Sequence, residues 1–507
     1  MYAHRAAPTV ADFVRISQRR LVVAYAAAGF CGLMVAAFSL FINPYLGFPV
    51  SAGIFALGLV LIAVRPIAGV YLITLLGLLA DNVTAPYWPF LKNGSSVESW
   101  LYVDGAIFIN PMEWFLLFTL LATAVHVALR RISLTKPPLI VPVGTLLGFV
   151  VVGALWGFGR GGADLKVGLW ELRPFFTLFL LYLLATNLIT TRRQVRALYL
   201  TVVAAVSIEG VRTAIWYAQT TDADLFNSIV EHSAATHINF VLISVFIGWV
   251  ISNSGIGFRL FLPLVAAPAI WAYLISERRS AIAALLVGVF VVLIFLRAEN
   301  KSKFMLVAPA LLIVGGAYTA AFWNAEGPIA YPAGAIKAQI APTETSYENQ
   351  ASDLYRQIEH FDIVFTIRQN PLLGVGFGQK YYRPIPLPDI SAGFIWWEYI
   401  THNGLLWIWL KTGYFGFVSM FFLIGRSLVS GLQNALQETN PFDKVIAVAA
   451  TAFVAMYVTF SYVDISWGAQ DMILMAVCLT IIARSGDSNR SDTAPPELSS
   501  STELVKA

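Results

Sequence analysis

The stretch SAIAALLVGVFVVLIFL, residues 280–296, decides the fold, because it contains no charged residue. It follows directly after Glu277, Arg278 and Arg279, and Arg297 comes immediately after it. Residues 21–42 form a second apolar run without any charge. Runs of about twenty apolar residues match the thickness of a bilayer and predict membrane-spanning helices.

The composition of the whole chain agrees with these two runs. Of 507 residues, 58% are hydrophobic and 12% are charged, which makes the chain far more apolar than a soluble domain. A soluble protein with large buried helices would have apolar runs of roughly 10–14 residues interrupted by charge. We therefore predict an all-α polytopic membrane protein with about 12–14 transmembrane helices and one long extracytoplasmic loop that contains amphipathic helices.

Hydropathy predicts about fourteen spans. They lie near 21–42, 48–64, 66–80, 107–129, 138–158, 172–190, 197–218, 238–253, 258–276, 280–296, 304–323, 403–425, 445–462 and 470–483. An N-terminus in the cytoplasm places most Lys and Arg residues of the loops on the cytoplasmic side, as the positive-inside rule requires. The arginines before residue 21 resemble a signal peptide, but the apolar run is long and no small-residue cleavage site follows, so we expect a retained first span.

This topology divides the chain into five segments. They are a cytoplasmic N-terminal segment (1–20), a transmembrane bundle of about eleven spans (21–323), an extracytoplasmic loop (324–402), the C-terminal spans (403–484) and a cytoplasmic tail (485–507). The tail is rich in Ser, Pro and acidic residues, a composition typical of disorder.

Several classes of site are not indicated. Cys31 and Cys478 lie in apolar runs near opposite ends of the chain and form no CxxC motif, so neither a disulfide framework nor a redox site is predicted. No nucleic-acid partner is suggested, and no cofactor is expected. We find no internal repeat, since the long outer block occurs once, and this asymmetry disfavours a transporter.

Arg278 and Arg279 lie at the predicted outer end of a span, where short loops are otherwise poor in positive charge. They could reach to the membrane surface as arginines at helix ends commonly do, or they could form an anion site. A guanidinium presents a fixed fork of donors that suits phosphate oxygens, for example those of a lipid carrier. Arg173, followed by Pro174, is another arginine predicted on the outer side.

Within the outer block, residues 355–367 are predicted to form an amphipathic helix along the membrane or over the bundle, with Leu354, Phe361 and Phe365 at helical spacing. Arg356 would project from it, and composition alone favours a surface arginine. The turn NPLLGVGFG (370–378) follows; its glycines permit close backbone approach, but the lysine and helix of a P-loop are missing.

His402 lies where the outer block meets a span. A single histidine is more often structural than catalytic, and no second His or acidic residue at i+3 or i+4 completes a zinc site. An imidazole there could accept a proton from a sugar hydroxyl, and Glu398, one helical turn earlier, could orient the ring or act as the base itself. Lys411, inside the following span, is expected to reach the outer surface or a water-filled cavity.

Together these features resemble the O-antigen ligase and O-antigen polymerase superfamily, membrane glycosyltransferases that use undecaprenyl-pyrophosphate-linked glycans. The similarity is spread over roughly 270–420. It rests on Arg279 opening a span, Arg356 early in a loop helix, the turn at 370–376, and His402 and Asn403 followed by Gly413 and Gly416. Two features depart from the family pattern: the chain has more than twelve predicted spans, and Lys411 stands where the family often has an acidic or neutral residue.

The resemblance implies a metal-independent, inverting transfer in the periplasmic loop, at the outer face of a bacterial inner membrane. Arg279 and Arg356 would hold the pyrophosphate, and His402 would deprotonate the acceptor hydroxyl. Further candidate substrate contacts are Arg278, Arg173, Asn403, Glu398, Lys380, Gly374 and Gly376. The implied partners are the undecaprenyl-pyrophosphate-linked oligosaccharide, a glycan or lipid A core acceptor, the bilayer, and polysaccharide export or chain-length proteins.

Three functions fit these features. The first is a polymerase of exopolysaccharide or O-antigen repeat units, or an O-antigen ligase, and the extra spans favour the polymerase. The second is a polysaccharide or lipid-linked oligosaccharide transporter (flippase), which would have two similar halves. The third is a noncatalytic assembly scaffold, which would tolerate the loss of His402.

Overall fold

The computed structural model describes residues 44–79, 109–219, 232–251, 256–341, 347–391, 395–464 and 466–485. Within these ranges the secondary structure consists of helices, without a β-strand. The helices are α2 (Pro44–Val64), α3 (Ile67–Leu78), α4 (Pro111–Ala128), α5 (Ile140–Gly159), α6 (Leu165–Leu188), α7 (Arg192–Gln219), α8 (His232–Val250), α9 (Ile256–Ile275), α10 (Arg279–Glu299), α11 (Lys301–Ala321), α12 (Tyr331–Ile340), α13 (Tyr347–Gln369), α14 (Gly404–Gln437), α15 (Pro441–Val463) and α16 (Ala469–Arg484). The predicted all-α fold is confirmed.

Each predicted span between residues 48 and 483 coincides with a helix. Among the described residues, eight helices are long and apolar enough to cross a membrane, so the chain is a multi-pass membrane protein. α3 has 12 residues and is therefore about 18 Å long, which is shorter than a hydrocarbon core of about 30 Å. The predicted span 21–42, the segment 1–20 and the tail from residue 486 lie outside the described residues.

Asparagine side chains fix the first turns of several helices. Asn110 and Glu113 form a reciprocal capping box at the start of α4. Asn403 begins α14, because its side-chain oxygen accepts a hydrogen bond from the Leu406 amide at 3.0 Å. These caps satisfy amide groups that have no partner inside the helix.

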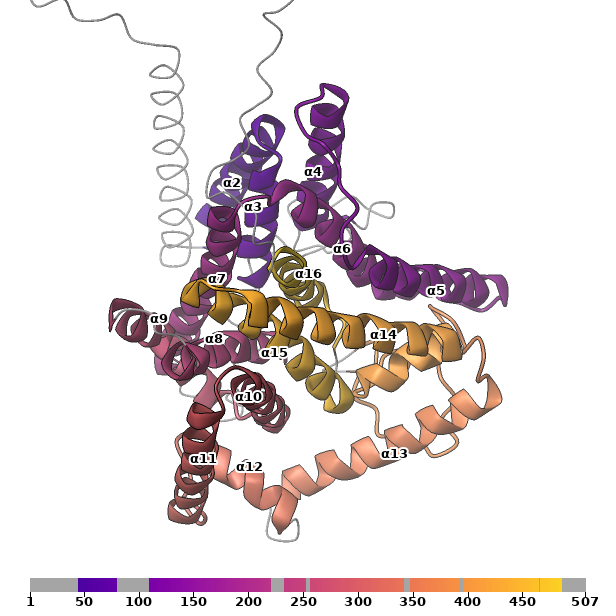
Figure 1. Ribbon diagram of the computed structural model, residues 1–507. Helices are drawn as coiled ribbons and strands as arrows, with labels where there is room; N and C mark the ends of the chain where they lie inside the picture. The colour runs from indigo at the N-terminus through magenta and orange to yellow at the C-terminus, as the bar shows by residue number, and fades with distance from the viewer. Residues whose placement is uncertain are drawn as a thin grey trace, which may run out of the picture.

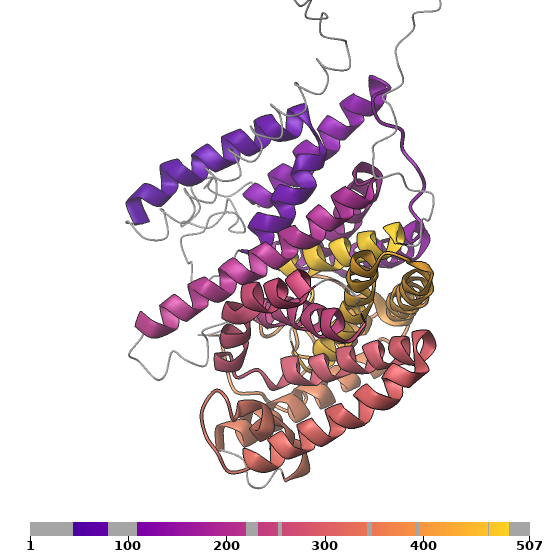
Figure 2. The ribbon, with the colours of Figure 1, turned by 60° about the vertical axis from the view of Figure 1, so that its left-hand side comes forward.

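The most deeply buried helices are α15 and α16, which lie in the middle of the bundle (Figure 1). α15 packs against α8, α10 and α14, and α16 packs against α6 and α3. By contrast, α11 has no buried residue. In Figure 2 the indigo helix α2 lies at the opposite end of the molecule from the salmon segment that contains α11–α13.

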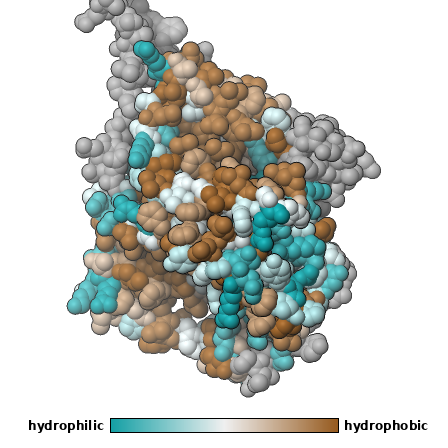
Figure 3. Space-filling model, turned by 90° about the vertical axis from the view of Figure 1, so that its right-hand side faces the viewer, coloured by the Kyte–Doolittle hydropathy of each residue, from teal (hydrophilic) through white to brown (hydrophobic). Residues whose placement is uncertain are grey.

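The predicted loop helix is present as α13, and its apolar stripe faces outward. Leu354, Phe361 and Phe365 are exposed, whereas Glu359 and Asp362 are buried. The exposed stripe fits a helix that lies along a membrane with these residues toward lipid, while Ile363 and Ile367 of the same helix are buried in the core and pack on the bundle. As a consequence, the polar face of α13 points into the protein. Figure 3 shows the face on the right-hand side of Figure 1, where hydrophilic residues gather at the lower right, below a largely hydrophobic region.

Candidate functional site

His402 is paired with Glu359 of α13. One Glu359 oxygen accepts a hydrogen bond from the His402 backbone amide at 2.9 Å, and both oxygens lie within 3.2 Å of the ring Nδ1. Because an ionised carboxylate only accepts hydrogen bonds, Nδ1 carries a proton, and the neutral ring therefore has its lone pair on Nε2. Within the described residues no hydrogen bond to Nε2 is found, and the His402 side chain is 20% exposed. The imidazole is thus oriented to accept a proton.

Tyr355 lies against the same imidazole. Its ring meets that of His402 edge-on, with centroids 5.5 Å apart. Burial, together with the negative charge of Glu359, raises the pKa of Tyr355 to about 12. The Tyr355 hydroxyl is buried and forms no hydrogen bond with a described residue, so it offers a neutral donor beside the imidazole.

Glu398 does not orient His402, and that hypothesis is wrong. Residues 395–399 form turns, and the helix starts only at Gly404, so residues 398 and 402 are not one helical turn apart. Instead, Glu398 forms ion pairs with both Lys380 and Arg383. Their hydrogen bonds, first that of Lys380, lower the pKa of Glu398, which keeps this carboxyl group ionised.

Arg279 is the first residue of α10 and reaches across to α13. Its guanidinium donates two hydrogen bonds to Asp353, at 2.8 and 3.2 Å. Ser280 fixes the same helix end through a 3.1 Å hydrogen bond to Asp464, and Arg278 is the N-cap residue. The arginine pair is therefore held at a fixed position relative to α13.

Arg356 lies on α13 three residues from Asp353 and three residues from Glu359. Residues three apart are neighbours on a helix surface, so Arg356 lies between the Arg279 contact and the His402 contact. It is half-buried and forms no ion pair with a described residue. One helix thus brings Arg279, Arg356 and His402 together, within about 9 Å along its axis from residue 353 to residue 359.

Arg173 forms an ion pair with Glu113 of α4, whose carboxylate oxygen lies 3.5 Å from the Arg173 Nε. Neighbouring residues of α6 contact the segment around His402, since Trp170 lies against Trp396 and Phe175 stacks on Trp407. The assignment of Arg173 to the substrate site stays a prediction. Asn403 belongs to the site's framework, as the N-cap that starts α14 next to His402.

Gly374 and Gly376 do not form a phosphate-binding loop. Both are buried, and both have positive φ angles, 66° and 89°, that favour glycine. A Cβ atom on Gly376 would lie 2.4 Å from the backbone of Gly157 in α5. The amide of Gly374 already donates to Asn370, at 2.9 Å. Close packing of the turn against the bundle accounts for these two glycines, and their contact with substrate stays a prediction.

A buried ion pair holds the end of this turn. Lys411 Nζ lies 2.9 Å from Glu171, and neither side chain is exposed. Lys411 also donates to the carbonyl of Gln379 at 2.6 Å, and Glu171 accepts from the amide of Gly378 at 2.7 Å. The prediction that Lys411 reaches the surface or a water-filled cavity is therefore wrong, because its charge is neutralised inside the protein.

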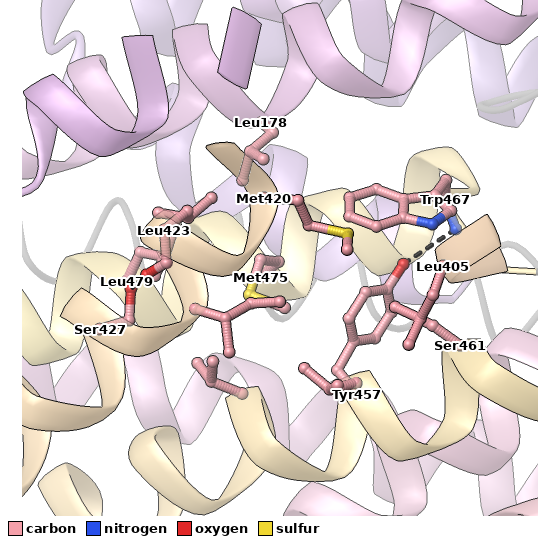
Figure 4. Close-up of a pocket in the computed structure, with 13 residues that line it drawn as sticks. Leu178, Leu405, Met420, Leu423, Ser427, Tyr457, Ser461, Trp467, Met475 and Leu479 are labelled. Carbon is pink, nitrogen blue, oxygen red and sulfur yellow. Dashed lines mark hydrogen bonds between the residues drawn. The ribbon is translucent and has the colours of Figure 1, made fainter. Parts of the chain in front are cut away.

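An apolar pocket lies beneath the first turn of α14 (Figure 4). Leu178, Leu405 and Met420 line it together with Tyr457 and Trp467. Its volume of about 20 Å³ suits a single water molecule rather than a substrate. Trp467 donates to the carbonyl of Gly404 at 3.0 Å, so these aromatic rings support the segment that carries His402.

Sequence reasoning missed Asp353, Tyr355, Glu359 and Arg383. The first three share one helix with Arg356, and a helical projection of residues 353–359 would have placed them on neighbouring positions. Arg383 gave no signal of its own, because its role depends on contacts with Trp397 and Glu398.

The fold and the site define a multi-pass α-helical membrane protein with guanidinium and imidazole groups gathered around one amphipathic helix, α13. Residues 264–421 match the family model described as O-Antigen ligase. The matched segment runs from α9 into α14 and contains Arg279, Arg356 and His402. The match confirms that this part of the chain resembles the O-antigen ligase and polymerase superfamily. No curated protein matches the chain.

Proposed function

We propose that this protein is a glycosyltransferase that moves an undecaprenyl-pyrophosphate-linked glycan to an acceptor hydroxyl at the periplasmic face of a bacterial inner membrane. It acts as a polymerase of exopolysaccharide or O-antigen repeat units, or as an O-antigen ligase. The N- and C-termini are cytoplasmic, and the loop 324–402 is periplasmic. The pairing of His402 with Glu359 is the observation that best supports this proposal.

In the proposed reaction His402 Nε2 takes the proton of the acceptor hydroxyl. The hydroxyl oxygen forms a bond to the anomeric carbon while the bond from that carbon to the pyrophosphate oxygen breaks, so the configuration inverts. Glu359 holds the ring and stabilises the imidazolium that forms. General base catalysis of this kind contributes about 10² to 10⁴ in rate.

The leaving pyrophosphate gains negative charge, and Arg279, Arg356 and Arg278 would stabilise it. The two hydrogen bonds of Arg279 to Asp353 have the forked geometry that a guanidinium also uses for phosphate oxygens. Arg356 has no ion-pair partner among the described residues and lies on the same helix. Because these guanidinium groups supply positive charge at the leaving group, the proposed transfer needs no metal ion.

The substitution His402→Ala tests the base. Cells that carry it should keep the protein in the membrane but accumulate undecaprenyl-linked glycan and lose the finished polymer. His360→Ala is the matched control, since His360 lies on the exposed side of α13, next to Glu359, and should tolerate the change. Normal polymer in the His402→Ala strain would refute the base assignment.

The form of the accumulated glycan identifies the activity. Loss of a ligase leaves long chains on undecaprenyl, whereas loss of a polymerase leaves single repeats. A transporter (flippase) is the second candidate. A strain that lacks a flippase would retain the lipid-linked repeats in the cytoplasmic leaflet of the inner membrane. Periodate added to intact spheroplasts would then fail to oxidise them, which distinguishes the two classes.

A further inference from the structure

Two cations and two aromatic rings form a cluster around Glu398. Lys380 and Arg383 both pair with this carboxylate. The Arg383 guanidinium lies 4.2 Å from the centre of the Trp397 ring, and Lys380 Nζ lies 5.6 Å from the centre of the Tyr399 ring. We call these five residues the Glu398 cluster.

The Glu398 cluster is anchored to α13 on the C-terminal side of Glu359. Thr366 donates to the carbonyl of Tyr382 at 3.1 Å and accepts from its amide at 3.0 Å. Asp362 accepts from the amide of Ile385 at 3.2 Å. These bonds fix the segment that carries Lys380 and Arg383 at a defined position on the helix.

The three functional features therefore follow one another along α13. Asp353, which binds Arg279, lies six residues before Glu359, about 9 Å along the axis, and Thr366 lies seven residues after it, about 10.5 Å. The order is the Arg279 contact, the His402 contact and the Glu398 cluster. The cluster thus lies on the side of the base that is opposite to Arg279.

The charges of the Glu398 cluster do not cancel. Lys380 and Arg383 share one carboxylate, so the cluster carries one excess positive charge. The Lys380 side chain is 52% exposed and has ammonium hydrogens left for a ligand, while Trp397 and Tyr399 are half-buried. A ligand that suits this surface combines an anionic group with an apolar face that can lie against aromatic rings.

We propose that the Glu398 cluster is the acceptor subsite and that it binds a sugar bearing a carboxylate, such as a uronic acid. This inference rests on the proposed function, in which the base takes its proton from the acceptor. A ligand next to His402 but away from Arg279 is then the acceptor rather than the pyrophosphate. The carboxylate pairs with Lys380, and the pyranose ring lies against Tyr399 or Trp397.

A lipid headgroup is the other anion that could reach this surface. The anchoring of the cluster favours the sugar, because Asp362 and Thr366 belong to the buried polar face of α13. The apolar stripe of Leu354, Phe361 and Phe365, which would contact lipid, lies on a different face of the helix. A subsite for the acceptor is thus separated from the surface that would face the membrane.

Binding to the full-length protein in detergent tests the proposal without turnover. The probes are two disaccharides of equal size, one ending in glucuronic acid and one ending in glucose, and the readout is titration calorimetry. Lys380→Gln should weaken binding of the glucuronate probe about tenfold, the expected loss of one charge-assisted hydrogen bond, and should leave the glucose probe unchanged. Lys337→Gln in α12 is the control and should change neither.

Equal binding of the glucuronate probe by Lys380→Gln and the native chain would overturn the proposal. So would a native chain that fails to prefer glucuronate over glucose. If Lys380→Gln instead lost binding to vesicles of phosphatidylglycerol while it kept the glucuronate probe, the cluster would be a lipid site. The proposed function is judged separately by the His402→Ala strain, so the two can fail independently.

Discussion

Asp353 holds the guanidinium of Arg279 with both carboxylate oxygens, at 2.8 and 3.2 Å, although 45% of the Asp353 side chain is exposed. The pair joins the first residue of α10 to the first half of α13. A carboxylate and a phosphate offer the same pair of acceptor oxygens to a guanidinium. Asp353 therefore occupies the position that the proposed function gives to the donor pyrophosphate.

Replacing Asp353 by Asn should lower the KM for the lipid-linked donor several-fold. The negative charge that competes with the pyrophosphate is removed, while the size of the side chain is kept. Steady-state kinetics with a lipid-linked donor would measure this, with Asp389→Asn in the same loop as the control. An increased donor KM would mean that Asp353 orients Arg279 instead of competing for it.

Replacing Glu359 by Gln should reduce kcat about tenfold to a thousandfold and leave the donor KM unchanged, because the amide no longer stabilises a protonated imidazole. Rapid-quench measurement of one turnover would isolate the chemical step. Gln357→Glu on the exposed side of the same helix serves as the control. A change confined to KM would indicate that Glu359 only shapes the binding surface.

The buried pair of Lys411 and Glu171 makes a prediction about stability. Lys411→Met leaves the Glu171 carboxylate buried without its partner, which should cost about 3–5 kcal/mol in the free energy of unfolding. The double variant Lys411→Met with Glu171→Leu should recover most of that loss. Lys444→Met breaks the partly exposed pair with Glu299 and should cost no more than about 1 kcal/mol. Thermal unfolding in detergent would compare these variants. If the double variant lost as much stability as the two single substitutions added together, the coupling between Lys411 and Glu171 would be disproved.

The spans, and the positions of Arg279 and His402 next to spans, were predictable because the length of an apolar run and the charges beside it are local features of the sequence. Residues 280–296 could form only a span; Arg279 lies in the short outer turn before that span, and His402 lies where the outer block meets the next one. The glycines at 370–378 predict a turn, which the structure has, but the α5 segment that this turn packs against lies more than two hundred residues earlier. Close packing between such distant segments leaves no local pattern.

The partners of the charged residues could not be predicted for the same reason. Glu359 precedes His402 by 43 residues, and Glu171 lies in a different helix from Lys411. Helical spacing predicts a contact between Glu398 and His402, whereas the structure has turns at residues 395–399. Whether a carboxylate orients an imidazole or neutralises a lysine depends on where the chain brings them together.

The kink in α14 supplies the last prediction. Gly413 has a φ angle of 72°, and a Cβ atom there would lie 1.9 Å from the carbonyl oxygen of Leu372 in the glycine turn. Gly413→Ala should therefore destabilise the protein by about 2–4 kcal/mol, through backbone strain and through displacement of the turn. Gly425→Ala, in the same helix with open space around it, should be neutral or should stabilise by up to about 1 kcal/mol. The turn leads directly into the segment that carries Lys380, so Gly413→Ala should also weaken binding of the glucuronate probe. If the variant were destabilised but bound the probe unchanged, the kink would support only the packing of the bundle.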